Sequence, residues 1–344
     1  MKTEQPGPLR VVEVSEGQLT GLRDLTSVLE QHLDGTEADF LDEAASLGPA
    51  AAQALPEVAD ALAELDQHRG APVVVLRLPG STVSGVRKTP TEYLSLGERN
   101  LFHPDAYRAL VVSMHQWYGY GFRSQQSGVL HNNVVSLQQF AGTPGHSASA
   151  ENTLDLHTED ASYNTDEFGG LSPDFLSLHF FRNPGSVPTA VADLAHDRLP
   201  VHVLSNLREP LFSNLTNPGQ GGAENDQQVW VPVVYGPSPN APWMRFNSAR
   251  MGLDRYGPAE REALETLRLH LESQRVELAA QPGDIVLLDN RRVAHGRPRF
   301  PDRPKHDGTD RWQRRLALAH NRERLAAFET SPRVVDPRLT AARL

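Results

Sequence analysis

Residues 154–160 read Leu-Asp-Leu-His-Thr-Glu-Asp, a run with the alternation of a β-strand. Side chains at positions i and i+2 of a strand point to the same face, so Asp155, His157 and Glu159 are expected to share one face. An imidazole and a carboxylate on one face can bind a divalent metal ion together. A third ligand must then come from another part of the chain.

Three other histidines are also followed by a carboxylate at the second position, but their settings differ. His32 and His270 lie in helical patterns, where residues i and i+2 are about 200° apart and cannot chelate one ion. His103 precedes a proline in a polar segment typical of a turn. His157 alone has a strand-like setting, which makes it the best candidate ligand of the four.

The composition is that of an ordinary globular protein. The chain has 344 residues, of which 39% are hydrophobic and 22% charged, and its net charge is −10. An acidic chain is a poor partner for nucleic acid or an anionic membrane. The absence of cysteine excludes disulfides, thiolate nucleophiles and zinc–sulfur sites. The N-terminus has no apolar signal segment and no run is long enough to span a membrane, so we expect a cytoplasmic protein.

Hydrophobic periodicity divides the chain into a helical first third and a strand-rich second half. Helices are predicted over 18–33, twice within 37–68, over 107–118 and over 258–273. Strands are predicted over 11–14, 71–79, 134–140, 175–181, 228–235, 275–279, 285–288, 293–295 and 311–320. This order predicts a mixed α+β protein with a barrel or sandwich core flanked by helices. The sequence has no GxGxxG, P-loop or GxSxG motif.

A candidate for the third ligand follows a buried strand near the C-terminus. His295 comes shortly after Gly-Asp-Ile-Val-Leu-Leu-Asp-Asn at 283–290. With His157 and Glu159 it makes a set of two histidines and one carboxylate. This facial triad leaves three coordination positions open on non-haem Fe(II).

The two motif segments together resemble the clavaminate synthase-like branch of the taurine-dioxygenase superfamily of Fe(II)/2-oxoglutarate oxygenases. The resemblance rests on residues 154–184 and 282–315, including Asp-Gly-Thr-Asp-Arg at 307–311. It implies a distorted double-stranded β-helix core, of the jelly-roll or cupin type, flanked by helices. One domain would cover 1–344, with a mostly helical part over 1–80 and the core over 130–320. The polar segments 143–152, 160–173 and 215–226 are candidates for a lid.

The resemblance also implies roles for individual residues. His157, Glu159 and His295 would be the catalytic ligands of Fe(II), which also binds 2-oxoglutarate and O2. Arg311 would hold the distal carboxylate of 2-oxoglutarate, a task suited to a planar guanidinium. Thr189 resembles the hydroxyl residue that assists the same carboxylate.

The substrate class follows from the same family. Its members include β-hydroxylases of free L-amino acids, so we expect hydroxylation of an unactivated C–H bond, at Cβ, in natural-product biosynthesis. Gln138, Gln139 and Asn247 are candidate substrate contacts, although the two glutamines could equally be ordinary polar residues of a strand. Members that act on arginine carry an acidic pair near the segment that here spans 244–250, which has no carboxylate. A buried guanidinium without a partner is costly, so we expect a substrate whose side chain is not strongly basic.

Two alternatives remain open from the sequence. The same cofactors support desaturation, cyclisation or epoxidation of a small metabolite. A non-catalytic binding protein could also share the β-helix fold.

Overall fold

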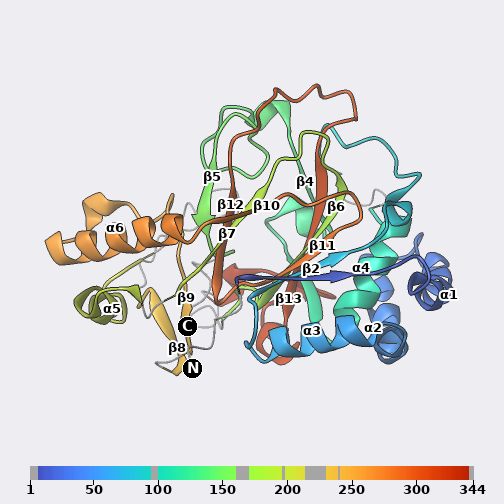
Figure 1. The fold of residues 1–344 in the computed structure, drawn as a ribbon, viewed down its shortest axis with the longest axis horizontal. Helices are drawn as coiled ribbons and strands as arrows, with labels where there is room; N and C mark the ends of the chain where they lie inside the picture. The colour runs from blue at the N-terminus through green and yellow to red at the C-terminus, as the bar shows by residue number, and fades with distance from the viewer. Residues whose placement is uncertain are drawn as a thin grey trace.

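Two β-sheets form the centre of the protein, and helices lie on both sides of them (Figure 1). The computed structural model describes residues 7–93, 100–159, 170–195, 198–213, 230–238 and 241–340. The helices are α1 (Leu19–Glu30), α2 (Glu37–Ala54), α3 (Pro56–Asp66), α4 (His103–Ser113), α5 (Val201–Leu207), α6 (Pro258–Ser273) and α7 (Glu323–Ala326). The strands are β1 (Leu9–Glu13), β2 (Val73–Arg77), β3 (Tyr118–Phe122), β4 (Asn132–Val135), β5 (Leu154–His157), β6 (Phe175–Arg182), β7 (Thr189–Asp193), β8 (Val234–Ser238), β9 (Ala241–Met244), β10 (Val276–Leu278), β11 (Ile285–Asp289), β12 (Val293–Arg297), β13 (Trp312–Ala319), β14 (Glu329–Ser331) and β15 (Val334–Val335).

The larger sheet has the strand order β1-β2-β11-β6-β13-β3-β15-β14, with β4 also paired to β13. Its central strands, β2, β11, β6 and β13, run antiparallel to their neighbours in this series. The smaller sheet has the order β10-β7-β12-β5, and β8 pairs with β9 in a separate hairpin. The two motif strands found in the sequence, β5 and β12, are therefore adjacent in the smaller sheet.

Alternation along the strands explains how the layers pack. In β11, Ile285 and Leu287 face helices α1 to α4, whereas Val286 and Leu288 face the smaller sheet. The inner layer between the sheets also contains Val191 of β7. The outer face of the smaller sheet packs against α5 and α6, so each sheet is buried on both faces. The observed architecture is thus mixed α/β, with helical layers outside two facing sheets.

Several predicted boundaries are wrong, each for a local reason. The helix predicted over 107–118 is α4, which begins at His103 because Pro104 fits the first turn and Asp105 caps the Phe102 N–H. His103 is therefore helical rather than part of a turn. The strand predicted over 134–140 is the shorter β4, and Gln138–Phe140 forms a 3-10 turn.

The predictions for the C-terminal half also need correction at some places. The polar sequence beyond residue 322, for which no strand is predicted, joins the larger sheet, because β15 pairs with β3. The strand predicted over 228–235 begins only at β8, and residues 228 and 229 lie outside the described residues. The proposed lid segment 215–226, and 160–169 of the lid segment 160–173, also lie outside them. Within the part of the chain that is described, no helix is both long and apolar enough to cross a membrane.

Candidate metal centre

His157, Glu159 and His295 lie together at one end of the smaller sheet. His157 of β5 is the direct cross-strand neighbour of His295 of β12, and their ring centroids are 4.4 Å apart. The Glu159 Oε2 atom lies 4.0 Å from His157 Nε2 and 3.7 Å from His295 Nε2. Across the described ranges, this is the one set of three such side chains whose ligand atoms all lie within 4.8 Å of one another. Strand pairing thus brings two sequence segments into one candidate metal centre.

The orientation of His157 leaves one ring nitrogen available. His157 Nδ1 lies 2.8 Å from the carbonyl oxygen of Asp155, and since a carbonyl only accepts, Nδ1 carries the proton. Burial, and then the neighbouring His295, lower the pKa of His157 to about 4. The ring is therefore neutral near pH 7, and its Nε2 lone pair faces Glu159. Asp155 contributes its carbonyl group here, not its carboxylate.

Glu159 is held at both its backbone and its carboxylate. Its N–H donates to Asn290 Oδ1 at 2.7 Å, and Asn290 Nδ2 donates back to the Glu159 carbonyl at 3.1 Å. Arg315 Nη1 donates to Glu159 Oε1 at 2.5 Å. Burial alone would raise the pKa of Glu159, but Arg315 and the two histidines hold it well below its ordinary value. Glu159 is therefore an ionised carboxylate in a fixed position.

Asn290 and Arg315 are site residues that the sequence did not predict. In the sequence Arg315 is only one of several arginines near Arg311. Alternation offered a signal, because residues 311, 313 and 315 fall on one face of a strand. Asn290 gave no local signal, since its partner Glu159 is 131 residues away in the sequence.

Arg311 is a buried cation directly before β13, the strand that carries Arg315. It is 5% exposed, its Nη2 donates to Gln313 Oε1 at 2.9 Å, and its guanidinium carbon lies 5.3 Å from the ring centroid of Phe180 and 5.9 Å from that of Phe300. Among the described residues, no carboxylate forms an ion pair with it and its Nε has no hydrogen-bond partner. Burial, and then the Arg297 guanidinium, lower the pKa of Arg311 to about 9, so it remains charged near neutral pH. A buried cation without an anion indicates a site for an anionic ligand.

Comparisons with known proteins agree with this geometry. Residues 232–317 match the family described as taurine catabolism dioxygenase TauD, TfdA family. The chain is 32% identical to enduracididine beta-hydroxylase of Streptomyces hygroscopicus over 241 residues, which are 62% of this chain and 67% of that protein. The chain belongs to the TauD/TfdA family. It is also 27% identical to clavaminate synthase 2 of Streptomyces clavuligerus, over 82% of this chain and 84% of that one.

A solved structure shares the fold of this TauD/TfdA-family chain. It is the non-heme iron oxygenase OrfP in complex with Fe, succinate and (3R,4R)-dihydroxy-L-Arg. The TM-score is 0.80 at 23% sequence identity, and the alignment covers 95% of this chain and 99% of that one. At this identity the likeness establishes the fold.

The remaining predicted site residues of this TauD/TfdA-family chain lie in different parts of the fold. Thr189 is buried at the start of β7, two residues before Val191, the cross-strand partner of His295. Gln138 and Gln139 are exposed on the 3-10 turn after β4, not on a strand. The backbone of Asn247 bridges to His157, while its Oδ1 accepts from the Ala249 N–H at 3.1 Å. Their roles toward ligands stay predictions.

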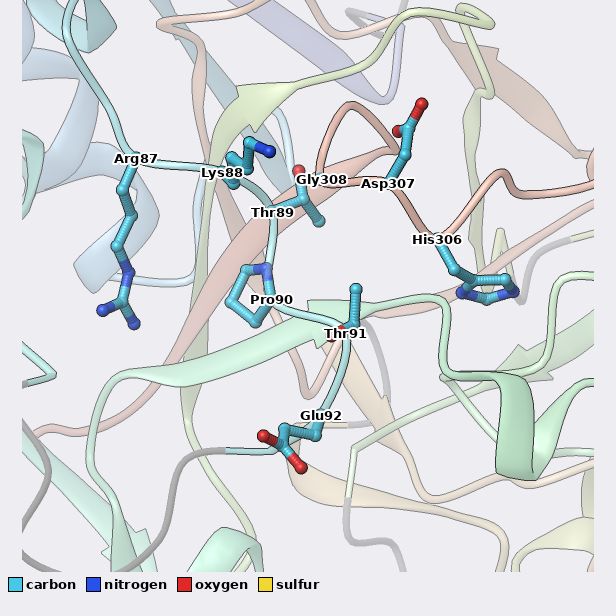
Figure 2. A pocket seen from close by; sticks show the side chains of 9 residues that line it. All are labelled: Arg87, Lys88, Thr89, Pro90, Thr91, Glu92, His306, Asp307 and Gly308. Atoms are coloured by element: carbon cyan, nitrogen blue, oxygen red, sulfur yellow. The ribbon is translucent and has the colours of Figure 1, made fainter.

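A surface hollow elsewhere does not belong to the triad. It has a volume of about 330 Å³ and lies between residues 87–92 and 306–308. Figure 2 shows the side chain of Asp307 pointing in the opposite direction from those of Arg87 and Glu92. Since these groups do not converge on a common point, the hollow does not resemble a site built for one ligand.

Proposed function

We propose that this TauD/TfdA-family protein is an Fe(II)- and 2-oxoglutarate-dependent oxygenase that hydroxylates a free L-amino acid or a close derivative. The observation that carries the proposal is the triad of His157, Glu159 and His295, with the buried Arg311 directly before β13, the strand that also supplies Arg315 to Glu159. The first group suits a metal ion and the second suits an acidic co-substrate.

The donor set of the triad fits ferrous iron. Two imidazoles and one ionised carboxylate form the 2-His-1-carboxylate arrangement of non-haem Fe(II) oxygenases. Bound iron would supply the oxidation of an unactivated C–H bond by O2, coupled to decarboxylation of 2-oxoglutarate to succinate. The Asp155 carbonyl sets the tautomer of His157, and Arg315 keeps Glu159 ionised. Asn290 fixes the backbone from which Glu159 projects.

Arg311 would bind the distal carboxylate of 2-oxoglutarate. Its guanidinium donates to Gln313 and lies over the rings of Phe180 and Phe300, so the planar donor group is already oriented before a ligand binds. Thr189 would assist through its hydroxyl. It lies on the same inner face as Val191, because the two are separated by two positions of β7.

The finer architecture follows from the two facing sheets. We propose that they form the distorted double-stranded β-helix, as one domain over 1–344 with the helical part over 1–80 and the core over 130–320. The support is the shared apolar layer between the sheets, which contains residues of β6, β7, β11 and β12.

A cytoplasmic location is part of the same proposal.

The residues of segment 244–250 bear on the substrate side chain. Enduracididine beta-hydroxylase and the OrfP complex point to guanidine-bearing amino acids for those proteins. In this chain, however, the segment 244–250 carries Arg245, which is 7% exposed and stacks on Tyr235, and Arg250. The backbone of this segment lies beside β5, where Asn247 bridges to His157, and cationic residues there would disfavour a basic substrate side chain. We therefore propose an acidic, amide or neutral side chain, with Gln138, Gln139 and Asn247 as candidate contacts.

The test is anaerobic addition of Fe(II) and 2-oxoglutarate, followed by O2 and a panel of L-amino acids read by mass spectrometry. We expect a weak visible charge-transfer band, its loss in His157→Ala, and succinate with a product heavier by one oxygen. His202→Ala is the matched control, because His202 is a solvent-exposed histidine on α5. Absence of both the band and succinate with every substrate would refute the proposal, and turnover of arginine in preference to asparagine would refute its substrate part.

A second candidate reaction is favoured by the similarity to clavaminate synthase 2 over most of the chain. The same cofactors would then support desaturation or cyclisation. Product mass separates the two, because hydroxylation adds one oxygen whereas desaturation removes two hydrogens.

A further inference from the structure

We propose that His68 and His320 form a second binding site for a divalent transition metal, separate from the triad. His68 follows α3, and His320 follows β13, so the site joins the helical layer to the larger sheet. The two Nε2 atoms face each other at 3.4 Å, and the rings are nearly perpendicular at 80°. This inference does not depend on the proposed oxygenase activity.

The hydrogen bonds at the other ring nitrogens determine what the facing atoms can do. His68 Nδ1 lies 2.8 Å from Asp289 Oδ2, and His320 Nδ1 lies 3.1 Å from Asp66 Oδ1. An ionised carboxylate only accepts hydrogen bonds, so each Nδ1 carries a proton. In the neutral rings both Nε2 atoms are therefore lone-pair acceptors, and two such atoms repel each other unless a cation lies between them.

The cation can be a proton, which Asp66 favours because its hydrogen bond raises the pKa of His320, or a metal ion, which the separation favours. Hydrogen bonds donated by nitrogen usually span about 2.7–3.2 Å. Two nitrogens bound to one tetrahedral Zn²⁺ at about 2.0–2.1 Å are separated by about 3.3–3.4 Å. The observed 3.4 Å agrees with the second geometry.

The surroundings of the pair are those of a supported metal site. Metal-binding histidines commonly donate their other N–H to a carboxylate, and here both do so. Asp66 is itself fixed by the indole N–H of Trp117 at 2.5 Å. Phe175 stacks on His68 and meets His320 edge-on, which restricts both rings.

Solvent can complete the coordination. The side chain of His68 is 17% exposed and that of His320 is 35% exposed, so water can occupy the two remaining tetrahedral positions. Imidazole ligands suit zinc, copper, nickel and iron. The site also has a link to the candidate metal centre, because Asp289 directly precedes Asn290, the residue that holds Glu159. A metal there would tie the end of α3 to the strand end that positions this carboxylate.

Zinc stoichiometry tests the proposal. In the His157→Ala/His295→Ala background the triad cannot bind metal, so we expect one Zn²⁺ per chain to remain after dialysis near neutral pH. Adding His320→Gln should remove it, and adding Asp66→Asn should weaken binding by about 10–100-fold. His115→Gln is the matched control, because His115 Nε2 already bonds the Ala59 carbonyl and cannot be a ligand.

Two results would overturn the proposal. One is a background variant that binds no Zn²⁺ although it melts like the parent protein. The other is unchanged zinc content after His320→Gln. If the double background does not fold, the same comparison is made in the parent chain, where His320→Gln should reduce two bound Zn²⁺ to one and an unchanged value refutes the site.

Discussion

Arg311 offers a direct test of the co-substrate site at the level of one residue. Its guanidinium is buried, charged and in contact with two aromatic rings. Arg311→Lys keeps the charge but loses the planar pair of donors. The loss should weaken the binding free energy of 2-oxoglutarate by about 1.5–3 kcal/mol, the usual contribution of a hydrogen bond to a charged group. We expect the KM for 2-oxoglutarate to rise about 10–100-fold in steady-state kinetics. The exposed Arg299→Lys is the control, and an unchanged KM in Arg311→Lys would exclude this role.

A substitution at Asn290 tests how Glu159 is held in position, because Asn290 is not itself a candidate metal ligand. Asn290→Asp removes the amide that donates to the Glu159 and Pro173 carbonyls and replaces it with an acceptor. We expect the affinity for Fe(II), measured by anaerobic titration, to fall about 10-fold or more, because groups that orient a ligand tune its metal. Asn321→Asp makes the same chemical change at an exposed position. Equal affinities in the two variants would contradict the positioning role.

Residue roles were predictable where a short pattern contained them. His157 and Glu159 share a strand motif, and the structure places both beside His295. Asn290 was not predictable, because its amide meets Glu159 only after β5 and β11 have joined their sheets. The His68–His320 pair joins residues 252 positions apart, so nothing local marks it.

At the scale of elements, periodicity and proline placed most helices correctly. The two helices predicted within 37–68 are α2 and α3, the second of which begins at Pro56, and α6 spans 258–273 as predicted. The errors fall in polar or aromatic runs, because the local pattern of such runs does not indicate which structure they adopt. Tyr118 falls within a predicted helix, but it begins β3 because its partner strand β13 supplies the backbone hydrogen bonds. Such pairing is a tertiary effect that outweighs local propensity.

Gly48 makes the contact between two helices possible. A Cβ at this position would lie 2.1 Å from the Ser113 carbonyl oxygen at the end of α4, which is backbone and cannot rotate away. Alanine normally stabilises a helix relative to glycine by about 1 kcal/mol. Here we expect the opposite sign, with Gly48→Ala lowering the free energy of unfolding by about 1–3 kcal/mol in urea denaturation. The neighbouring exposed Ser46→Ala should change it by less than about 0.5 kcal/mol, and a stabilised Gly48→Ala would contradict the close approach.

At the scale of the whole molecule, a buried charge cluster connects the helical layer to the larger sheet. Asp105 of α4 accepts from Arg108 Nη2 and from Arg314 Nη1 of β13, each at 2.8 Å, and all three side chains are fully buried. In the sequence these residues are indistinguishable from the many surface charges. Only the assembled layers remove them from water, so the cluster could not be predicted from composition or periodicity. Such clusters fix how two layers meet, because a shift would leave a charge without its partner.

Asp105 should therefore control stability in a pH-dependent way. Burial alone would raise its pKa, but Arg314, His131 and Arg108 hold the pKa well below the ordinary value of 3.8. A depressed folded-state pKa contributes stability above the unfolded pKa, and this contribution is lost as pH falls through the folded pKa.

We expect Asp105→Asn to lower the free energy of unfolding by about 3–5 kcal/mol near pH 7, because it leaves two buried guanidinium groups without their carboxylate. The deficit relative to the parent protein should then shrink as pH falls below about 4, because only the parent loses the Asp105 contribution there. Urea denaturation of both proteins across this range measures the difference. Asp60→Asn, at an exposed aspartate of α3, is the control for removing one carboxylate. A deficit that stays constant with pH would show that Asp105 acts through shape rather than charge, and would remove it as the electrostatic link between the layers.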